Sequence, residues 1–174
     1  MKLEELKRTI RQVPDFPKPG INFYDVATLF RDPHALHTAV ERMVEHYRGK
    51  PIDLLAGIEA RGLVLASALA YQLGLGLVLI RKAGKLPGKT ETETYELEYG
   101  KEQVEIQSDA VGPDRRVVVI DDLLATGGTA AAAGRLVSRL GGHLAGYGFM
   151  VELGFLHGRK KLGGCDVFSL LSYD

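Results

Sequence analysis

Tryptophan is absent from this chain, and cysteine, net charge and long apolar runs are scarce or missing. Its 174 residues include one cysteine, Cys165, so no disulfide can form within the chain, and we expect a reducing compartment. The 22 basic residues balance 22 acidic ones, which argues against a general nucleic-acid or membrane-binding surface. Nowhere do about 18 apolar residues follow one another, as a membrane-spanning helix requires. We therefore expect a cytoplasmic protein that binds neither nucleic acid nor membranes.

The first residues, MKLEELKRTI, lack the apolar core of a signal peptide. A chain of this length fits one domain, which buries about 70% of the surface of its unfolded chain. We see no repeat and no linker, so we expect a single domain over residues 1–174. The five histidines show no spacing typical of metal ligands, and we expect no metal cage built by the protein.

Strands and helices alternate along most of the chain. Apolar runs predict strands at 52–56, 77–80, 117–120, 145–151 and 167–171. Helical spacing predicts helices at 3–13, 33–47, 60–73, 130–140 and 156–162, the second capped by Asp32 with Pro33 in its first turn. This alternation predicts an α/β fold with a mostly parallel central sheet flanked by helices.

The exception is the segment 85–107, where polar and apolar residues alternate on both sides of Gly100-Lys101. These two residues are typical of a hairpin turn. The polar content and central position favour a mobile β-hairpin flap that excludes water from a site. An ordinary edge hairpin is the alternative.

The segment 117–130, VVVIDDLLATGGTA, carries the strongest functional signal. Four β-branched residues predict a strand buried on both faces, which should end where open α/β sheets bind ligands. Asp121 and Asp122 follow, and then a loop leads into a helix whose first N–H groups can bind phosphate. Paired carboxylates beside an anion repel it unless hydroxyl groups or a cation separate them. A ribose that carries a phosphate fits both parts of this segment, because its hydroxyl groups can bind the two carboxylates and its phosphate can bind the start of the helix.

This segment resembles the phosphoribosyl pyrophosphate motif of type I phosphoribosyltransferases. Four further blocks follow the family's order: DFPKPGI at 15–21, EARG at 59–62, LIRKAGKLPG at 79–88 and LEYG at 97–100. The resemblance covers nearly the whole chain and is closest to the members that accept adenine. It implies a fold with an N-terminal hood and base-pocket segment at 1–32 and a flap hairpin at 85–107.

The resemblance also implies how the donor is bound. Asp121 and Asp122 bind the ribose hydroxyls, and the 5′-phosphate lies on the loop Ala125, Thr126, Gly127, Gly128 and Thr129. Pyrophosphate is bound by Arg61, Arg81, Lys82 and Lys85, and Arg61 also stabilises the charge that builds on this leaving group. Arg81 is a candidate for reaching a neighbouring subunit's site.

Two further sets of residues are implied for the base. Glu98 matches the family's general acid/base, and the adenine pocket consists of Ile21, Asn22, Phe23, Tyr24, Leu123 and Leu153. Tyr24 stands where enzymes that use adenine often carry arginine, and tyrosine lacks a guanidinium fork. A phosphoribosyltransferase for another purine such as xanthine therefore stays open.

The implied reaction converts adenine and phosphoribosyl pyrophosphate to AMP and pyrophosphate in purine salvage. The implied cofactor is Mg²⁺, held mainly by the substrate and water, and the implied assembly is a homodimer. A non-catalytic sensor of the donor or of a purine is the alternative from another class. It would need a DNA-binding segment or a basic face, and neither is visible in this sequence.

Overall fold

A computed structural model describes residues 1–97 and 100–174; the side chain of Leu97 and all of residues 98 and 99 lie outside the described part. Its contacts cluster into two units, Met1–His46 and Tyr47–Asp174. That the whole chain forms one domain stays a prediction.

The N-terminal unit combines short helices with a two-stranded sheet. Its elements are α1 (Leu3–Arg8), β1 (Arg11–Val13), β2 (Phe23–Asp25), α2 (Ala27–Arg31) and most of α3 (Pro33–Tyr47). The expected start of α3 is confirmed, because a carboxylate oxygen of Asp32 accepts the backbone N–H groups of His34 and Ala35.

The prediction of a helix over residues 3–13 is wrong beyond Arg8. The strand β1 pairs antiparallel with β2, with Gln12 opposite Tyr24. The partner strand begins ten residues after β1 ends. Pairing with this strand determines the structure of residues 11–13 despite the helical spacing of the apolar residues, because tertiary contacts commonly override local helix propensity.

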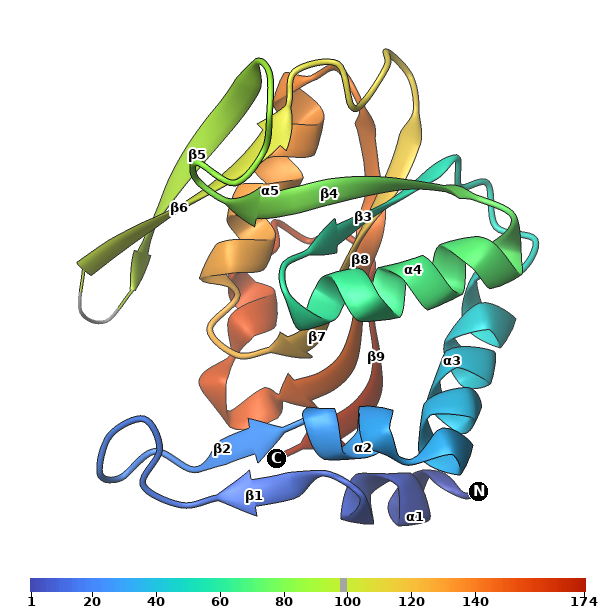
Figure 1. Ribbon diagram of the computed structural model, residues 1–174, viewed down its shortest axis with the longest axis vertical. Coiled ribbons are helices and arrows are strands. Elements are labelled where there is room, and N and C mark those ends of the chain that lie inside the picture. Colours follow the sequence, from blue (N-terminus) through green and yellow to red (C-terminus); the bar gives the residue numbers. More distant parts are fainter. Residues whose placement is uncertain (98–99) are drawn as a thin grey trace. The chain divides into compact units, whose positions relative to one another are not determined.

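The larger unit is built on a seven-stranded sheet (Figure 1). Its strands are β3 (Leu54–Ile58), β4 (Gly76–Lys82), β5 (Thr90–Leu97), β6 (Gly100–Gln107), β7 (Arg116–Leu124), β8 (His143–Leu153) and β9 (Val167–Tyr173). Their order is β5-β6-β4-β3-β7-β8-β9; β4, β3, β7, β8 and β9 are parallel, whereas β6 is antiparallel to both of its neighbours. The predicted α/β fold with a mostly parallel sheet is confirmed.

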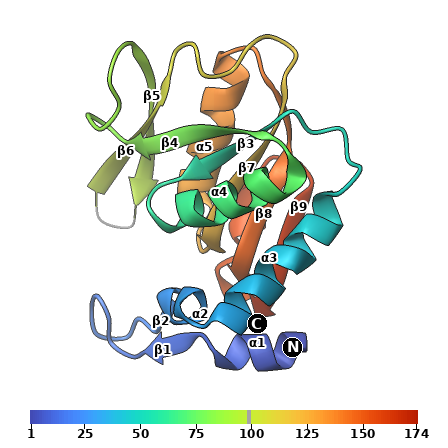
Figure 2. The ribbon, with the colours of Figure 1, turned by 45° about the vertical axis from the view of Figure 1, so that its right-hand side comes forward.

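The helices α4 (Arg61–Leu73) and α5 (Gly128–Arg139) cover the two faces of this sheet (Figure 2). A Cβ atom added to Gly57 of β3 would meet Leu63 and Ala66 of α4. The alternate residues Val117 and Val119 of β7 belong to the apolar cluster that includes the alanines of α5. Side chains 117–120 are at most 2% exposed, as expected for a parallel strand covered on both faces.

Two local predictions needed correction. Gly100 and Lys101 do not form the hairpin turn, because they pair within β6 with Leu97 and Glu96 of β5. The helix expected at 156–162 consists of two 3₁₀ segments, η1 (Gly154–Leu156) and η2 (Gly158–Lys161). Among the described residues, no helix combines the length and apolar character needed to cross a membrane.

Candidate active site

The carboxyl end of β7 is exposed on one side because its neighbour β3 is shorter. The last paired residues of these two strands are Gly57 and Ile120, whereas β7 continues to Leu124 along β8. Asp121 and Asp122 therefore lie within β7, just past its last pairing with β3. The sequence had placed them at this edge, but the predicted strand ended at residue 120, four residues before the end of β7.

The two carboxylates have different partners. Asp122 is only 5% exposed, and its Oδ2 accepts a hydrogen bond of 2.5 Å from Nε of Arg61. The Oδ1 of Asp121 accepts the backbone N–H of Asp122 at 2.8 Å. Burial raises the pKa of Asp121 well above its ordinary value, and the adjacent charge of Asp122 raises it further. A ligand that donates hydroxyl groups or brings positive charge would relieve this cost.

Gly62 lets the start of α4 approach these acids. A Cβ atom at this position would lie 2.7 Å from Oδ1 of Asp121 and 2.9 Å from the carbonyl oxygen of Ile120. A side chain here would therefore push the helix, and with it Arg61, away from the end of β7. Gly62 is thus required by close packing rather than by an unusual backbone angle.

The loop between β7 and α5 forms a small cradle. A cavity of about 70 Å³ is lined by Asp121 and by residues 123–130, and α5 begins at Gly128 with Gly127 as its N-cap. Gly127 has a φ of 79°, and a Cβ there would collide with the backbone of Gly158. Liquid water occupies about 30 Å³ per molecule, so the cradle fits a group the size of a phosphate rather than a whole nucleotide.

Two of the predicted pyrophosphate cations, Arg81 and Lys82, end β4, and Lys85 follows it. Nε of Arg81 donates to Glu59 at 2.6 Å, and its Nη1 donates to the carbonyl oxygen of Lys85 at 3.2 Å. Nζ of Lys82 lies 3.5 Å from Glu102, and the Lys85 side chain is exposed. Arg61 projects at the neighbouring end of β3. Four cationic side chains thus lie at the carboxyl ends of two adjacent strands, and Arg61, Arg81 and Lys82 are each paired there with a carboxylate.

A buried carboxylate from β6 shapes the loop that carries Lys85. Glu105 is 4% exposed, and its Oε1 accepts the N–H groups of Lys85 and Leu86 at 2.7 Å each. Burial by itself would raise the pKa of Glu105, but the backbone donors of this loop hold it below its ordinary value. Sequence reasoning missed Glu105 and Glu59, because only pairing across the sheet places them beside the cations.

The strand β5 passes close to the phosphate cradle. A Cβ at Gly128 would lie 3.4 Å from the ring of Tyr95, and the Tyr95 hydroxyl donates to Glu102 at 2.8 Å. Burial raises the pKa of Tyr95 to about 12, and Thr129 is a further hydrogen-bond partner of its phenol. Tyr95 is a third residue that sequence reasoning missed. Glu98, the predicted acid/base, lies outside the described residues.

Leu123 and Leu153 share one face of the sheet, because Leu123 is opposite Val151 and side chains alternate along β8. The other predicted base-pocket residues, at 21–24, belong to the N-terminal unit. There the rings of Phe16 and Phe23 meet edge to face at 5.2 Å, and the Asn22 amide donates to Gln12 at 2.8 Å. That both sets form one adenine pocket stays a prediction.

The possible metal ligands of the site are few. No group of three or more His, Cys, Asp or Glu side chains with metal-binding geometry occurs in the described part of the chain. Asp121 and Asp122 could contribute carboxylate oxygens, the type of ligand that Mg²⁺ prefers, although Asp122 is already paired with Arg61. The residues fit a metal ion held chiefly by its substrate.

Comparisons with known proteins agree with this architecture. The phosphoribosyl transferase domain family matches residues 30–153. An adenine phosphoribosyltransferase of Solibacter usitatus is 54% identical over 172 residues, covering 99% of both chains. The crystal structure of adenine phosphoribosyltransferase from Thermoanaerobacter pseudethanolicus superposes with a TM-score of 0.96 at 48% identity, over 99% of this chain and all of the other. The Saccharomyces cerevisiae enzyme, solved with an imino-altritol bisphosphate and adenine, gives 0.91 at 43% identity over 97% and 98% of the two chains.

The parallel sheet, the paired acids at the end of β7 and the cradle before α5 are those of a type I phosphoribosyltransferase. About half of its residues are identical to those of adenine phosphoribosyltransferases over nearly their full length. The chain therefore belongs to the adenine phosphoribosyltransferase family.

Proposed function

We propose that this chain transfers the 5-phosphoribosyl group of phosphoribosyl pyrophosphate to adenine, which yields AMP and pyrophosphate. The bond from C1 of the ribose to the pyrophosphate oxygen breaks, and a bond from C1 to N9 of adenine forms. The observation that carries the proposal is the pair Asp121 and Asp122 between the cradle at the start of α5 and the guanidinium of Arg61.

The donor is held at two ends. The N–H groups of the loop 125–129 bind the 5′-phosphate, since the first N–H groups of a helix have no partners within it. Asp121 and Asp122 accept hydrogen bonds from the two ribose hydroxyls. This binding fixes C1 of the sugar near the end of β7 and relieves the repulsion that raises the pKa of Asp121.

The leaving group develops negative charge as its bond to C1 lengthens. Arg61, Lys82 and Lys85 stabilise that charge, and preorganised cations act strongly because they need not reorient during the reaction. Glu105 and Arg81 position the loop that carries Lys85 through hydrogen bonds to its backbone. Mg²⁺ bound by pyrophosphate oxygens and water would neutralise further charge.

Adenine loses a proton when it attacks through N9. Glu98 takes part in this proton transfer as general acid/base, and the pocket of residues 21–24 with Leu123 and Leu153 holds the ring. Positioned proton transfer typically contributes about 10² to 10⁴ to the rate. The protein acts as a homodimer in the cytoplasm, within purine salvage.

The test is pyrophosphate release with Mg²⁺ and phosphoribosyl pyrophosphate, with adenine, hypoxanthine, guanine, xanthine or orotate offered separately. We expect release with adenine. Release with xanthine alone would support the donor site but show that the accepted base is xanthine, an outcome that the tyrosine at position 24 in place of arginine allows. Donor binding without release for any base would favour a sensor.

A further inference from the structure

A second cavity lies along α5, beyond the residues that form the phosphate cradle. It measures about 470 Å³ and is lined by residues of α5, β8 and the segment 161–165. None of its lining residues belongs to the cradle. Its volume lies within the range of about 300–1,000 Å³ typical of small-molecule sites, but it is an open depression, so a ligand bound there stays partly exposed to solvent.

The rim of this cavity is cationic. Arg135, Arg139 and Lys161 line it, and no acidic side chain does so in the described part of the chain. Arg135 and Arg139 both pair with the single carboxylate of Glu93 in β5, so these three side chains together retain a charge of one. With Lys161, the rim attracts an anion.

Apolar side chains and the phenol of Tyr147 form much of the floor, and Ser138 and Cys165 also line the cavity. Leu144 and Leu162 contribute apolar surface, and Tyr147, which is 4% exposed, reaches the cavity beside Gly134. No hydrogen-bond partner of the Tyr147 hydroxyl is found among the described residues. Burial raises the pKa of Tyr147 to about 12, so at neutral pH this group is a hydrogen-bond donor. Among the described residues no buried side-chain N or O atom lacks a hydrogen-bond partner, so this hydroxyl oxygen is open to the cavity, where a ligand can replace water as its partner.

We propose that this cavity binds a small aromatic phosphate monoester, with its ring on the Leu144 and Leu162 surface and its phosphate between Lys161 and the two arginines. Planar guanidinium groups bind phosphate through paired charge-assisted hydrogen bonds. The Tyr147 hydroxyl donates a hydrogen bond at the inner end of the cavity. No bond is made or broken in this site.

The same arginines connect the cavity to the flap. Nε of Arg135 donates to Glu93 at 2.6 Å, and Nη1 of Arg139 donates to the carbonyl oxygen of Thr92 at 2.9 Å. A phosphate on the rim competes with Glu93 for these guanidinium groups. Ligand binding therefore weakens the attachment of β5 to α5, and removal of the Glu93 charge strengthens ligand binding.

The test is calorimetric titration of the full chain with 1-naphthyl phosphate in the presence of saturating ribose 5-phosphate, which occupies the phosphate cradle but carries no aromatic ring. We expect one binding site per chain, with binding weakened about tenfold or more for the uncharged 1-naphthol, since about 1.4 kcal/mol corresponds to each factor of ten. Absence of binding, or binding that ribose 5-phosphate abolishes, would overturn the proposal.

Four variants locate the site. Lys161→Gln and Tyr147→Phe should each weaken binding about three- to tenfold, as expected for the loss of one charge-assisted or buried hydrogen bond. Lys160→Gln is the matched control, because Lys160 does not line the cavity. Glu93→Gln should tighten binding several-fold, and Glu91→Gln on the same strand should not. Unchanged affinity in both Lys161→Gln and Tyr147→Phe would place the probe elsewhere.

Discussion

At the scale of single residues, the site depends on the unequal surroundings of two adjacent carboxylates. Arg61 neutralises Asp122, while Asp121 accepts the backbone N–H of Asp122 and has an elevated pKa because of burial and the adjacent charge of Asp122. The folded protein therefore contains one carboxylate that is compensated and one that is held at a cost. Such costs are common where a ligand later supplies the missing partner.

Asp121→Asn should make the protein more stable and less active. Folding raises the pKa of Asp121, so the folded protein disfavours the charged carboxylate. Stability is therefore lost as pH rises from the pKa of the unfolded chain, about 3.9, to the higher pKa of the folded protein. At pH 7 the variant should melt a few degrees higher, since about 1 kcal/mol shifts Tm by roughly 2–4 °C in a domain of this size. The difference should shrink as pH falls, and kcat/KM for the donor should drop at least about tenfold through the lost charge-assisted hydrogen bond.

Asp122→Asn is the matched control. It leaves Arg61 without its charged partner, so its Tm at pH 7 should fall rather than rise. Thermal melts of both variants at pH 7 and pH 5 separate the two cases. A lower Tm for Asp121→Asn at pH 7 would contradict the prediction.

Glu98→Gln should retain donor binding but lose at least about tenfold in kcat, the low end of what positioned proton transfer contributes. Glu96→Gln is its control, because Glu96 is an exposed acid in the same hairpin. Steady-state kinetics with adenine, together with titration of the donor alone, distinguish turnover from binding. An unchanged kcat would remove Glu98 from the mechanism.

At the scale of elements, α4 and α5 each bring their first residues to the carboxyl end of β7. The start of α4 supplies Arg61, and the start of α5 forms the phosphate cradle. The two helices lie on opposite faces of the sheet, so the ligand site forms where the loops before them converge. The close approach of α4 depends on Gly62.

Gly62→Ala isolates this approach. Within a helix, alanine is about 1 kcal/mol more favourable than glycine, so an unobstructed site would gain stability. Here the added Cβ would meet Asp121 and the backbone of Ile120, and we expect a lower Tm and weaker donor binding. Gly112→Ala is the control, since its nearest atom would lie 3.8 Å away. A rise in Tm for Gly62→Ala would show that the helix can shift without cost.

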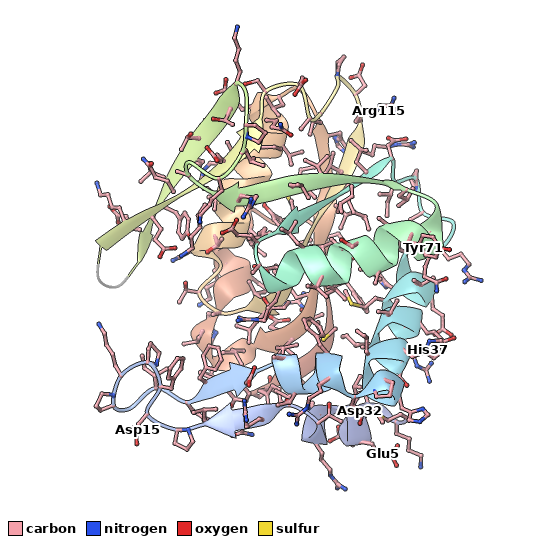
Figure 3. All side chains as sticks on the ribbon, viewed as in Figure 1. Glu5, Asp15, Asp32, His37, Tyr71 and Arg115 are labelled. Atoms are coloured by element: carbon pink, nitrogen blue, oxygen red, sulfur yellow. The ribbon has the colours of Figure 1, made fainter. Side chains whose placement is uncertain are left out.

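At the scale of the whole molecule, one apolar surface of the larger unit suits association with a second copy. Leu77 and Leu79 of β4 are 37% and 39% exposed. Their register with Leu55 and Gly57 places them on the face of the sheet that α4 covers. On α4 itself, Val64 is 52% exposed, and Tyr71, which projects outward in Figure 3, is 88% exposed. Exposed apolar side chains that gather on one face commonly mark interfaces.

We expect sedimentation to show a dimer, and Leu79→Glu combined with Tyr71→Glu to shift it to monomer, because the charges would be buried unpaired. Leu156→Glu in η1, also on an exposed leucine, should leave the dimer intact. A wild-type monomer at assay concentration would contradict the homodimer.

The sequence by itself determined the parallel α/β fold, the buried strand before Asp121 and the glycine loop before α5. These features depend on local chemistry: β-branched residues favour a doubly covered strand, and a helix start exposes N–H groups wherever it occurs. Only the tertiary structure decided that residues 11–13 form a strand, that Glu105 holds the Lys85 loop and that Arg61 pairs with Asp122. Each of these depends on partners between ten and more than sixty residues away. Local sequence patterns do not indicate which of these distant residues the folded sheet brings together.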